Sequence, residues 1–469
     1  MIIMKFGGSS LATASRMQKV TELIIGSEEA PCVVLSAMGD TTDKLFATAE
    51  AAGDGRSADA LLLIEEIFAT AQAVIDELLE DPTQITTALA QLRTDTELLV
   101  RGICRTADRA PDATLTARTT DALVAHGERI ATLVLSEHLR QQGKQVIAVD
   151  ARDVIRTNDA YGKAKPMRGH ILQRTHQNMG PHLAHGIIVV TQGFVGSAPD
   201  GTTTTLGRGG SDWSAALLCA ALGGDELQIW TDVEGVLTAD PRIVDEPQPI
   251  AHLSPDEAAE LAAFGARVLH PSTIQPVVDK GIPVTVRHTM RPDGAFTRID
   301  RESTENAAGI AALASRGPIT VLTMTSRRML DASGYLARLF EVFGELDIPV
   351  DLVTTAEVSV ACTVEADAPI QRLIAALDGH AHVETTTDCA IVAAIGDGLQ
   401  HTDRVLERAC RALYPIKPQM VSYGGNSRNL SFVVRSIEQD AALRRLHDEF
   451  FGDTNSAPNA PAAIEESNG

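Results

Sequence analysis

The chain has 469 residues, of which 44% are hydrophobic and 22% charged, the balance of an ordinary globular protein rather than of a disordered or collagen-like one. Its length suggests about three domains. The formal net charge is −22, and so acidic a surface disfavours nucleic acid and anionic membranes as partners. A site for an anionic substrate must therefore be built locally, from backbone N–H groups and a few placed cations.

The cysteines and the apolar runs point to an intracellular type of protein. Six cysteines are scattered without a C-x-x-C pair, and Cys32, Cys219 and Cys362 lie in apolar runs typical of buried free thiols. We therefore expect no disulfide framework and no metal site. The first residues lack the features of a secretory signal, and the apolar run Ala215–Leu222 is well short of the roughly 20 residues of a membrane span. We expect a cytoplasmic protein.

Residues 1–300 alternate short β-branched runs with longer amphipathic stretches. The runs are mostly continuously apolar, as in parallel strands covered on both faces, and they predict strands at Ile2–Phe6, Val33–Ala37, Val146–Asp150, Ile187–Thr191, Leu227–Asp232 and Val284–Arg287. A helical pattern runs from Leu123 to Leu139, and another opens at Ser254 with a capping-box Glu257. The alternation predicts an α/β layered sheet.

Beyond Arg301 the pattern changes to two β-α-β-β units. Predicted strands lie at Ile319–Met324, Val350–Val353, Val358–Val364, Ala390–Ile395, Met420–Tyr423 and Leu430–Val434, with helices at Gly334–Leu346, from Pro369, and at Thr402–Leu413. Two units of similar length indicate a duplicated small α+β module. The residues from about Asp453 to Gly469 have the composition of a disordered tail.

A glycine pair follows the first predicted strand directly, in Lys5-Phe6-Gly7-Gly8-Ser9-Ser10. Paired glycines at a strand-to-helix turn let backbone N–H groups approach an anion, and Lys5 would point at the same anion. A tight turn beside a solvated lysine would have the same sequence. The chain contains neither a P-loop motif nor G-x-G-x-x-G, so a dinucleotide-binding domain finds no support.

A second candidate anion-binding loop runs from Thr202 to Asp212 and contains four threonines, three glycines and Arg208. The guanidinium of Arg208 could grip a carboxylate or phosphate bidentately. Asp212, at the start of the next helix, could orient a nearby lysine. The alternative is a flexible loop that ends in an Asp N-cap.

Other polar residues are weak signals when each is taken alone. Thr231 and Asp232 end a predicted strand, where ligands of open α/β sheets collect, but an Asp there is usually a turn residue. Asp240-Pro241-Arg242, Arg267 and His126-Gly127-Glu128 also have ordinary structural explanations. Together, two glycine-rich loops with Lys5 and Arg208 imply a site for two anionic partners, which is what phosphoryl transfer between anions requires.

With these motifs, the sequence resembles the aspartate kinase family over nearly its whole length, about residues 1–450. The motifs that carry the resemblance are Lys5–Ser10, Val33–Ala37, His126–Glu128, Gln192–Phe194, Thr202–Asp212, Trp230–Val233 and Phe264–Pro271. The resemblance implies ATP-dependent phosphorylation of the β-carboxylate of L-aspartate, the first step of lysine, threonine and methionine biosynthesis. It is closest to the lysine-sensitive, single-function type.

The resemblance also implies the architecture. Residues 1–300 would adopt the amino-acid-kinase fold, an open, mostly parallel sheet between helix layers. Residues 301–452 would form tandem ACT regulatory domains, the first over about 316–388 and the second over about 305–315 plus 389–452, followed by the tail 453–469. We expect a homodimer through the ACT domains.

The site residues follow from the resemblance position by position. It implies catalytic roles for Lys5 and Asp212, with Arg208 gripping the aspartate α-carboxylate and Glu128 accepting its ammonium group. The implied substrate side is Ser36, Thr42, Glu128, Phe194, Arg208, Gly209 and Ser211. The implied ATP side is Lys5, Gly7, Gly8, Ser9, Thr231, Asp232, Leu237, Arg242 and Arg267, with Mg²⁺ carried by the nucleotide phosphates. Arg267 and Leu237 depart from the Lys and Tyr of relatives.

An effector site is implied in the first ACT unit. The matching positions are Met329, Gly334, Tyr335, Leu336, Val350 and Asp351, and Asp351 would be the counter-ion of a lysine effector. Ala332 and Ala356 stand where lysine-sensitive relatives often carry serine, which predicts weaker inhibition. Two alternatives stay open: a kinase for another small acid, and an amino-acid-binding regulator without catalysis.

Overall fold

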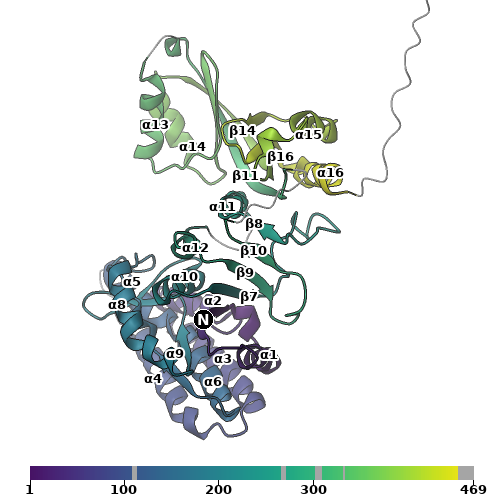
Figure 1. Ribbon diagram of the computed structural model, residues 1–469. Coiled ribbons are helices and arrows are strands. Elements are labelled where there is room, and N and C mark those ends of the chain that lie inside the picture. The colour runs from purple at the N-terminus through teal and green to yellow at the C-terminus, as the bar shows by residue number, and fades with distance from the viewer. Residues whose placement is uncertain (108–112, 266–270, 302–308, 331–332, 453–469) are drawn as a thin grey trace, which may run out of the picture. The chain divides into compact units, whose positions relative to one another are not determined.

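The computed structural model describes residues 1–107, 113–265, 271–301, 309–330 and 333–452 (Figure 1). The chain forms two compact units. The first contains residues 1–236, 249–262 and 271–301 of the described chain, and the second contains the rest. The segment Leu237–Gln248 groups with the second unit, although the sequence placed a single boundary near residue 300, because Ala239 and Val244 pack into that unit's core.

The first unit is built on one eight-stranded sheet with the order β3-β4-β2-β1-β7-β9-β10-β8. Its strands are β1 (Ile2–Phe6), β2 (Cys32–Leu35), β3 (Val146–Val149), β4 (Ile188–Gln192), β7 (Glu226–Thr231), β8 (His252–Leu253), β9 (Val284–His288) and β10 (Thr297–Ile299). Only the β9–β10 pairing is antiparallel. The six predicted strands all form, within two residues of their expected ends, and the mostly parallel sheet is confirmed.

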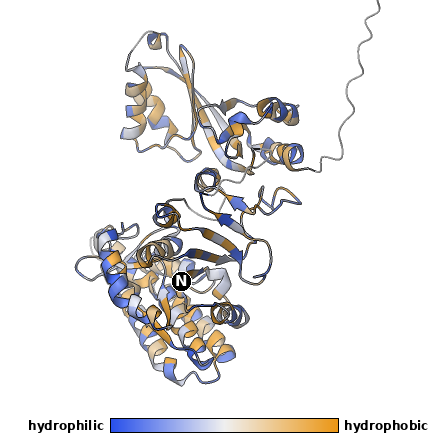
Figure 2. Cartoon of the chain, viewed as in Figure 1, coloured by the Kyte–Doolittle hydropathy of each residue, from blue (hydrophilic) through white to orange (hydrophobic). Residues whose placement is uncertain are grey.

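Helices pack against this sheet and around its edges. They are α1 (Ala14–Ile25), α2 (Thr41–Gly53), α3 (Ser57–Leu78), α4 (Thr83–Ala107), α5 (Ala113–Val124), α6 (His126–Gln141), α7 (Ala151–Val154), α8 (Arg168–Asn178), α9 (Gly180–Ala184), α10 (Gly210–Leu222), α11 (Pro255–Ala263) and α12 (Pro271–Val278). Hydrophobic and hydrophilic residues interleave along them (Figure 2), as expected of helices with one buried face. The capping box is confirmed, because the Ser254 N–H donates to Glu257 at 2.9 Å and the Glu257 N–H donates to Ser254 Oγ at 3.1 Å.

Two local expectations were wrong. The helix predicted over Leu123–Leu139 is two helices, α5 and α6, that meet at Ala125. Ala125 keeps helical dihedral angles, φ −60° and ψ −15°, so the interruption leaves the apolar spacing intact. The threonine run expected as loop is partly strand, because β6 (Thr203–Thr205) forms a hairpin with β5 (Val195–Ser197).

The second unit is one antiparallel sheet of six strands with the order β12-β13-β11-β14-β16-β15. Its elements are β11 (Ala312–Thr325), α13 (Tyr335–Glu345), β12 (Val353–Thr355), β13 (Ser359–Glu365), α14 (Ile370–Leu377), β14 (His382–Ile395), α15 (Val405–Leu413), β15 (Met420–Tyr423), β16 (Asn429–Arg435) and α16 (Gln439–Phe451). β12 begins later than the predicted Val350, because the backbone of Asp351 and Leu352 bonds to Thr363 outside the regular ladder.

Strand β11 belongs to both halves of this sheet. Its first part, through Arg316, pairs with the end of β14, and its last part, from Ile319, pairs with β13 and the start of β14, with a register shift between. Two buried clusters follow from this division. One contains Leu322, Phe343 and Leu373, and the other lies under α15 and α16. Each half thus has its own hydrophobic core, as the duplicated pattern predicts.

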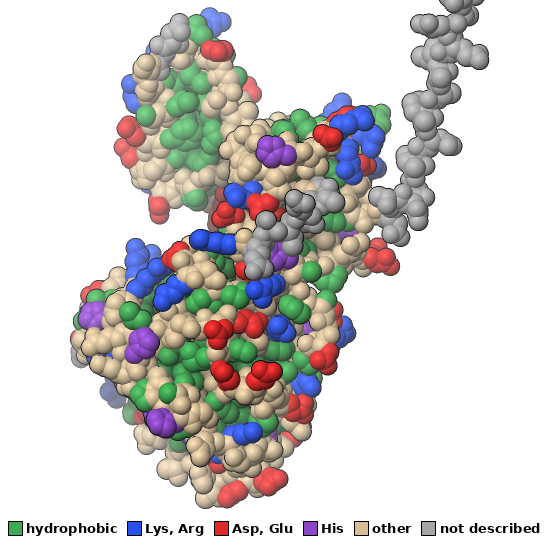
Figure 3. All heavy atoms as spheres, viewed as in Figure 1, with side chains coloured by type: hydrophobic (Ala, Val, Ile, Leu, Met, Phe, Trp, Pro, Cys, Tyr) green, Lys and Arg blue, Asp and Glu red, His purple; other side chains and the backbone are tan. Residues whose placement is uncertain are grey.

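Two further observations bear on partners. In the part of the chain that the structure describes, no helix combines the length and the apolar character needed to cross a bilayer. Acidic side chains gather on the visible face of the first unit (Figure 3), consistent with the net charge of −22.

Candidate active site

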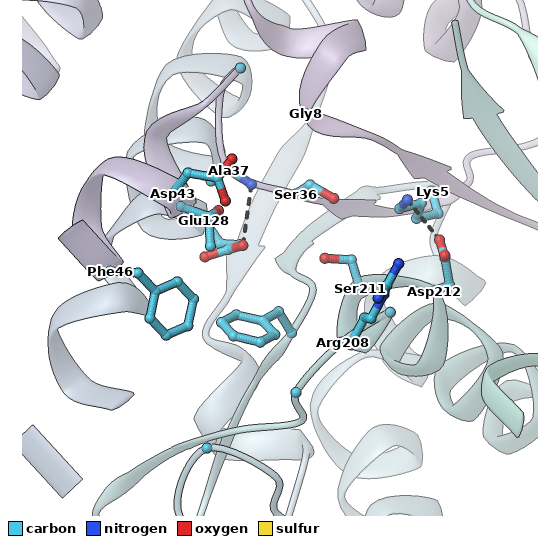
Figure 4. A pocket seen from close by; sticks show the side chains of 17 residues that line it. Lys5, Gly8, Ser36, Ala37, Asp43, Phe46, Glu128, Arg208, Ser211 and Asp212 are labelled. Atoms are coloured by element: carbon cyan, nitrogen blue, oxygen red, sulfur yellow. Dashed lines mark hydrogen bonds and ion pairs between the residues drawn. The ribbon is translucent and has the colours of Figure 1, made fainter. Parts of the chain in front are cut away.

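A cavity of about 560 Å³ opens where β1 and β2 end and α10 begins (Figure 4). This is the edge of a parallel sheet at which ligands collect. The cavity is lined by Lys5, Gly8, Ser36, Ala37, Gly39, Thr42, Asp43, Phe46, Glu128, Gly162, Phe194, Gly207, Arg208, Gly209, Gly210, Ser211 and Asp212. Both glycine-rich loops therefore meet at one cavity, together with Ser36, Thr42, Glu128 and Phe194.

The first glycine loop lies against the loop that follows β2. A Cβ atom on Gly8 would lie 2.9 Å from the carbonyl oxygens of both Ala37 and Gly39, closer than side-chain carbons approach backbone. The Gly39 N–H donates to the Gly8 carbonyl at 2.9 Å, and the Gly7 N–H donates to the Trp230 carbonyl at 3.0 Å. Close backbone packing thus requires glycine at position 8 and places Lys5 at the cavity.

Lys5 and Asp212 form an ion pair across the cavity. The Lys5 Nζ and Asp212 Oδ1 atoms are 2.7 Å apart, and the side chains are 11% and 15% exposed. Asp212 lies in the first turn of α10, where the helix dipole favours a carboxylate. The pair fixes the ammonium group of Lys5 in the cavity rather than leaving it in solvent.

Arg208 lies on the second loop between two glycines with left-handed backbone. Gly207 has φ +77° and Gly209 has φ +71°, a conformation that glycine adopts without strain. Arg208 is exposed, lines the cavity beside Ser211 (Figure 4) and forms no ion pair within the described chain. A cation so placed is available to an anionic ligand.

Glu128 is a buried carboxylate with one unused oxygen. The residue is 2% exposed, and its Oε1 accepts from the Ala37 N–H at 3.3 Å. Within the described chain, Oε2 has no hydrogen-bond partner. Burial raises the pKa of Glu128 to about 8, against the opposing effect of its backbone hydrogen bonds. The cavity therefore contains a carboxyl group that a cationic ligand could ionise.

His126 is structural, in agreement with its interpretation from the sequence. Its Nδ1 lies 2.7 Å from Thr96 Oγ1. Burial lowers the pKa of His126 to about 3, so the ring is neutral at physiological pH. It does not line the cavity.

Phe194 closes one side of the cavity in a strained conformation. Its φ is +66°, which is unusual for a bulky residue. The conformation is held from both sides, because the Phe194 N–H donates to Ser214 Oγ at 3.0 Å and its carbonyl accepts from the Leu206 N–H at 2.9 Å. Ser214 belongs to α10, so the helix that carries Asp212 also fixes Phe194.

The remaining predicted nucleotide residues are not in the cavity lining. Thr231 and Asp232 lie at the carboxyl end of β7, where Thr231 Oγ1 donates to Asp232 at 3.1 Å. Arg242 bonds to the Asp240 carboxylate at 3.0 and 3.1 Å through Nε, and it groups with Leu237 in the second unit. Arg267 lies outside the described residues. Gly7 and Ser9 flank Gly8 in the first loop.

Asp43 and Phe46 line the cavity although the sequence analysis did not select them. Both lie on α2, one and four residues after Thr42. Helical spacing from Thr42 could have found Phe46, at i+4, but not Asp43, at i+1. Gly162 was missed for another reason. It comes from a loop far from either glycine motif, and only the folded structure brings it to the cavity.

In the second unit, four of the predicted effector residues lie around the start of α13 (Met329, Gly334, Tyr335 and Leu336), whereas Val350 and Asp351 follow the end of that helix. Gly334 has φ +78° at the helix N-cap, and the buried Tyr335 donates its hydroxyl to the His380 carbonyl at 2.6 Å. Leu336 is exposed, while Met329 and Val350 pack on the core of this half. The Asp351 carboxylate is engaged by Arg316, with Nη1 and Oδ1 3.0 Å apart.

Each of the two units contains a region that matches a known protein family. Residues 1–288 match the amino acid kinase family, and residues 392–450 match an ACT domain. Fold and site together therefore define an amino acid kinase with an attached regulatory module.

The individual relatives are aspartokinases. The chain is 38% identical to lysine-sensitive aspartokinase 3 of Escherichia coli over 96% of this chain and 99% of that protein. It is 35% identical to aspartokinase 1, chloroplastic, of Arabidopsis thaliana over 96% and 80%. Two crystal structures of E. coli aspartokinase III are also similar. One holds aspartate and ADP in the R-state, with a TM-score of 0.81, 35% identity and coverage of 96% and 100%. The other holds lysine and aspartate in the T-state, with a TM-score of 0.77, 35% identity and coverage of 96% and 99%.

The chain belongs to the aspartokinase family. It is an aspartate kinase, an enzyme that transfers a phosphoryl group to the β-carboxylate of aspartate. This confirms the resemblance and decides against the two alternatives, a kinase for another acid and a regulator without catalysis.

Proposed function

We propose that the cavity holds aspartate between Arg208 and Glu128, with the β-carboxylate directed to Lys5. The observation that carries this arrangement is one cavity that holds both Glu128 and Arg208. Within the described residues, Oε2 of Glu128 has no hydrogen-bond partner, and the exposed Arg208 forms no ion pair. An amino acid offers an ammonium group to the first and an α-carboxylate to the second. Ser36, Thr42, Phe194, Gly209 and Ser211 would form the walls around it.

The reaction then needs positioning and charge compensation rather than a general base. The β-carboxylate is already ionised at neutral pH, because an Asp side chain titrates near pH 4. One of its oxygens forms a bond to the γ-phosphorus of ATP while the bond from that phosphorus to the β–γ bridging oxygen breaks. The products are 4-phospho-L-aspartate and ADP. Lys5, oriented by Asp212, would stabilise negative charge on the transferring group.

ATP would enter as its magnesium complex, so the metal belongs to the substrate. Among the residues that the structure describes, no group of three or more His, Cys, Asp and Glu side chains could hold a metal ion. The cavity's Asp212 carboxylate is engaged by Lys5. Phosphate oxygens and water are the ligands that Mg²⁺ commonly takes in such sites. The backbone of Gly7, Gly8 and Ser9 would contact the phosphates.

Thr231, Asp232, Leu237, Arg242 and Arg267 remain our proposal for the rest of the nucleotide site. Thr231 and Asp232 support it by their place at the carboxyl end of β7, next to β1 in the sheet. In the free protein, Arg242 is bonded to Asp240, so binding of a nucleotide by Arg242 would exchange one anion for another.

For regulation, we propose lysine as the effector and the second unit as its site. A relative of known structure binds lysine in its T-state. Asp351 would receive the effector's side-chain ammonium group, which must compete with Arg316 for that carboxylate. Met329, Gly334, Tyr335, Leu336 and Val350 would surround the ligand. We also propose a homodimer through the ACT domains, supported by the exposed edge strand β12.

Two substitutions test the proposed roles separately. Arg208→Ala should raise the KM for aspartate far more than that for ATP, because a charge-assisted bidentate contact is worth about 2–4 kcal/mol, or roughly thirty- to several-hundred-fold in kcat/KM. Lys5→Ala should instead lower kcat by about a hundredfold or more with little change in aspartate binding, since its charge acts mainly in the transition state. Steady-state kinetics on both substrates provides the measurement. An unchanged aspartate KM in Arg208→Ala would remove Arg208 from the substrate site.

A further inference from the structure

A buried carboxylate behind the Arg208 loop has no part in the site described so far. Asp121 lies on α5 and is 2% exposed. Its carboxylate accepts four hydrogen bonds: from the Thr205 N–H at 2.8 Å, from Thr205 Oγ1 at 2.8 Å, and from the Gly162 N–H at 3.0 and 2.9 Å to its two oxygens. One side chain thus joins α5 to two segments that are distant in sequence.

Both of those segments lead directly into the cavity. Gly162 lines it, and Thr205, the last residue of β6, is three residues before Arg208. The two segments also contact each other. The Ala164 N–H donates to the Thr205 carbonyl at 2.9 Å, and a Cβ atom on Gly207 would lie 3.1 Å from the Gly162 carbonyl oxygen. Asp121 therefore bonds to the base of the loop from which Arg208 projects.

The hydrogen bonds of the Asp121 carboxyl group make a purely space-filling role a poor explanation. Burial raises its pKa, while the hydrogen bonds from Gly162 and Thr205 oppose that effect. In the described part of the chain, Asp121 forms no ion pair. A buried carboxyl is costly unless hydrogen-bonded, and here all of its bonds go to the two segments that shape the Arg208 side of the cavity.

We propose that Asp121 is a positioning residue for aspartate binding, which holds Thr205 and Gly162 so that the Arg208 loop presents its guanidinium group to the α-carboxylate. This inference rests on the proposed role of Arg208. The first glycine loop, which would contact the phosphates, is held by Ala37, Gly39 and Trp230 instead. The inference therefore predicts an effect on aspartate that ATP does not share.

The main variant is Asp121→Asn, which keeps the shape but replaces one acceptor oxygen by a donor. We expect it to raise the KM for aspartate about tenfold, the equivalent of one lost hydrogen bond to a charged group, while the KM for ATP changes less than about twofold. Thr205→Val removes only the hydroxyl donor and should raise the aspartate KM several-fold. Thr205→Ser restores the hydroxyl and should return the KM close to the wild-type value.

Asp300→Asn is the matched control for the loss of a buried, hydrogen-bonded carboxylate. Asp300 is 9% exposed, lies at the start of the connection after β10, bonds to His252 at 2.6 Å and to Arg298, and does not line the cavity. It should lower the melting temperature without changing either KM. Asp121→Asn should differ from this control because it also raises the KM for aspartate.

Three results would overturn the inference. Asp121→Asn could lower the melting temperature as the control does and leave the aspartate KM within twofold. Both KM values could rise in parallel, or Thr205→Ser could behave like Thr205→Val. If Asp121→Asn does not fold, the Thr205 pair decides alone. Arg208→Ala is measured alongside: if it leaves the aspartate KM unchanged, the proposed function fails first, whereas a large effect of Arg208→Ala with none of Asp121→Asn refutes only the positioning role.

Discussion

Glu128 offers a test of the site that does not depend on turnover. Burial raises its pKa from 4.5 to about 8, so the folded protein keeps a proton on this carboxyl over a pH range in which the unfolded chain has lost it. The stabilising effect of that proton is fully present below pH 4.5 and is lost as the pH rises through about 8. Replacing Glu128 by Gln removes the titration and nearly preserves the shape.

The expected magnitude follows from proton linkage. With one more proton bound in the folded state, the free energy of unfolding falls by about 1.4 kcal/mol per pH unit. Between about pH 5.5 and 7.5, the stability of wild type relative to Glu128→Gln should therefore fall by roughly 2–3 kcal/mol. The difference in the free energy of unfolding between the two proteins at a single pH is less informative. The Gln amide would itself have no hydrogen-bond partner among the described residues at the position of Oε2.

Denaturant unfolding at several pH values measures this slope. Both tryptophans, Trp213 and Trp230, lie in the first unit, so their fluorescence follows the unit that contains Glu128. Glu137→Gln is the matched control, because Glu137 is buried on the same helix but is bonded to Arg140 and Gln141. Saturating aspartate should abolish the slope, since its ammonium group would ionise Glu128 in the proposed arrangement. Equal pH slopes in wild type and Glu128→Gln would refute the reasoning.

Further variants test regulation and packing. Asp351→Ala should raise the lysine concentration for half-inhibition, and Arg316→Ala should lower it, because Arg316 competes for the Asp351 carboxylate. Neither variant should change the uninhibited kcat. Inhibition by threonine instead of lysine would show the effector assignment to be wrong. Gly127→Ala would place its Cβ 2.8 Å from that of Ala37, which should cost about 1–3 kcal/mol of stability and raise the aspartate KM. Gly102→Ala, in open space on α4, should be stabilising by about 0.5–1 kcal/mol in thermal unfolding; equal effects of the two would exclude the packing explanation.

The parts of the fold that sequence predicted are those set by local chemistry. The strands at Ile2–Phe6 and Ile187–Thr191 were found because strands covered on both faces have mostly apolar runs. The capping box at Ser254 is visible because its two hydrogen bonds involve residues only three positions apart. The glycine at position 8 also stood out, although its packing against the Ala37 and Gly39 carbonyls could not be read from the motif.

The parts that sequence missed depend on long-range contacts. The positive φ of Phe194 is imposed by Ser214 and Leu206, and nothing about a phenylalanine in a motif signals it. The sequence pattern predicted only the second part of β11, as Ile319–Met324, because Gly317 and Pro318 interrupt the apolar pattern. The sheet bridges that interruption with a register shift. The resemblance identified Glu128, but only the structure showed that its second oxygen has no hydrogen-bond partner among the described residues.

The charges in the cavity explain how so acidic a protein can bind an acidic substrate. Lys5 and Asp212 neutralise each other at 2.7 Å, and Glu128 holds a proton up to about pH 8 because it is buried. Asp43 lines the cavity from an exposed position, where water and salt screen it. In the proposed arrangement, Arg208 is then the unbalanced charge that an incoming acid would meet. In the same arrangement, the substrate's ammonium group would ionise Glu128, so that the site exchanges a proton for a cation. Only an acid that also carries an amino group can both pair with Arg208 and ionise Glu128. The raised pKa of Glu128 would therefore contribute to selection for amino acids over simple dicarboxylates.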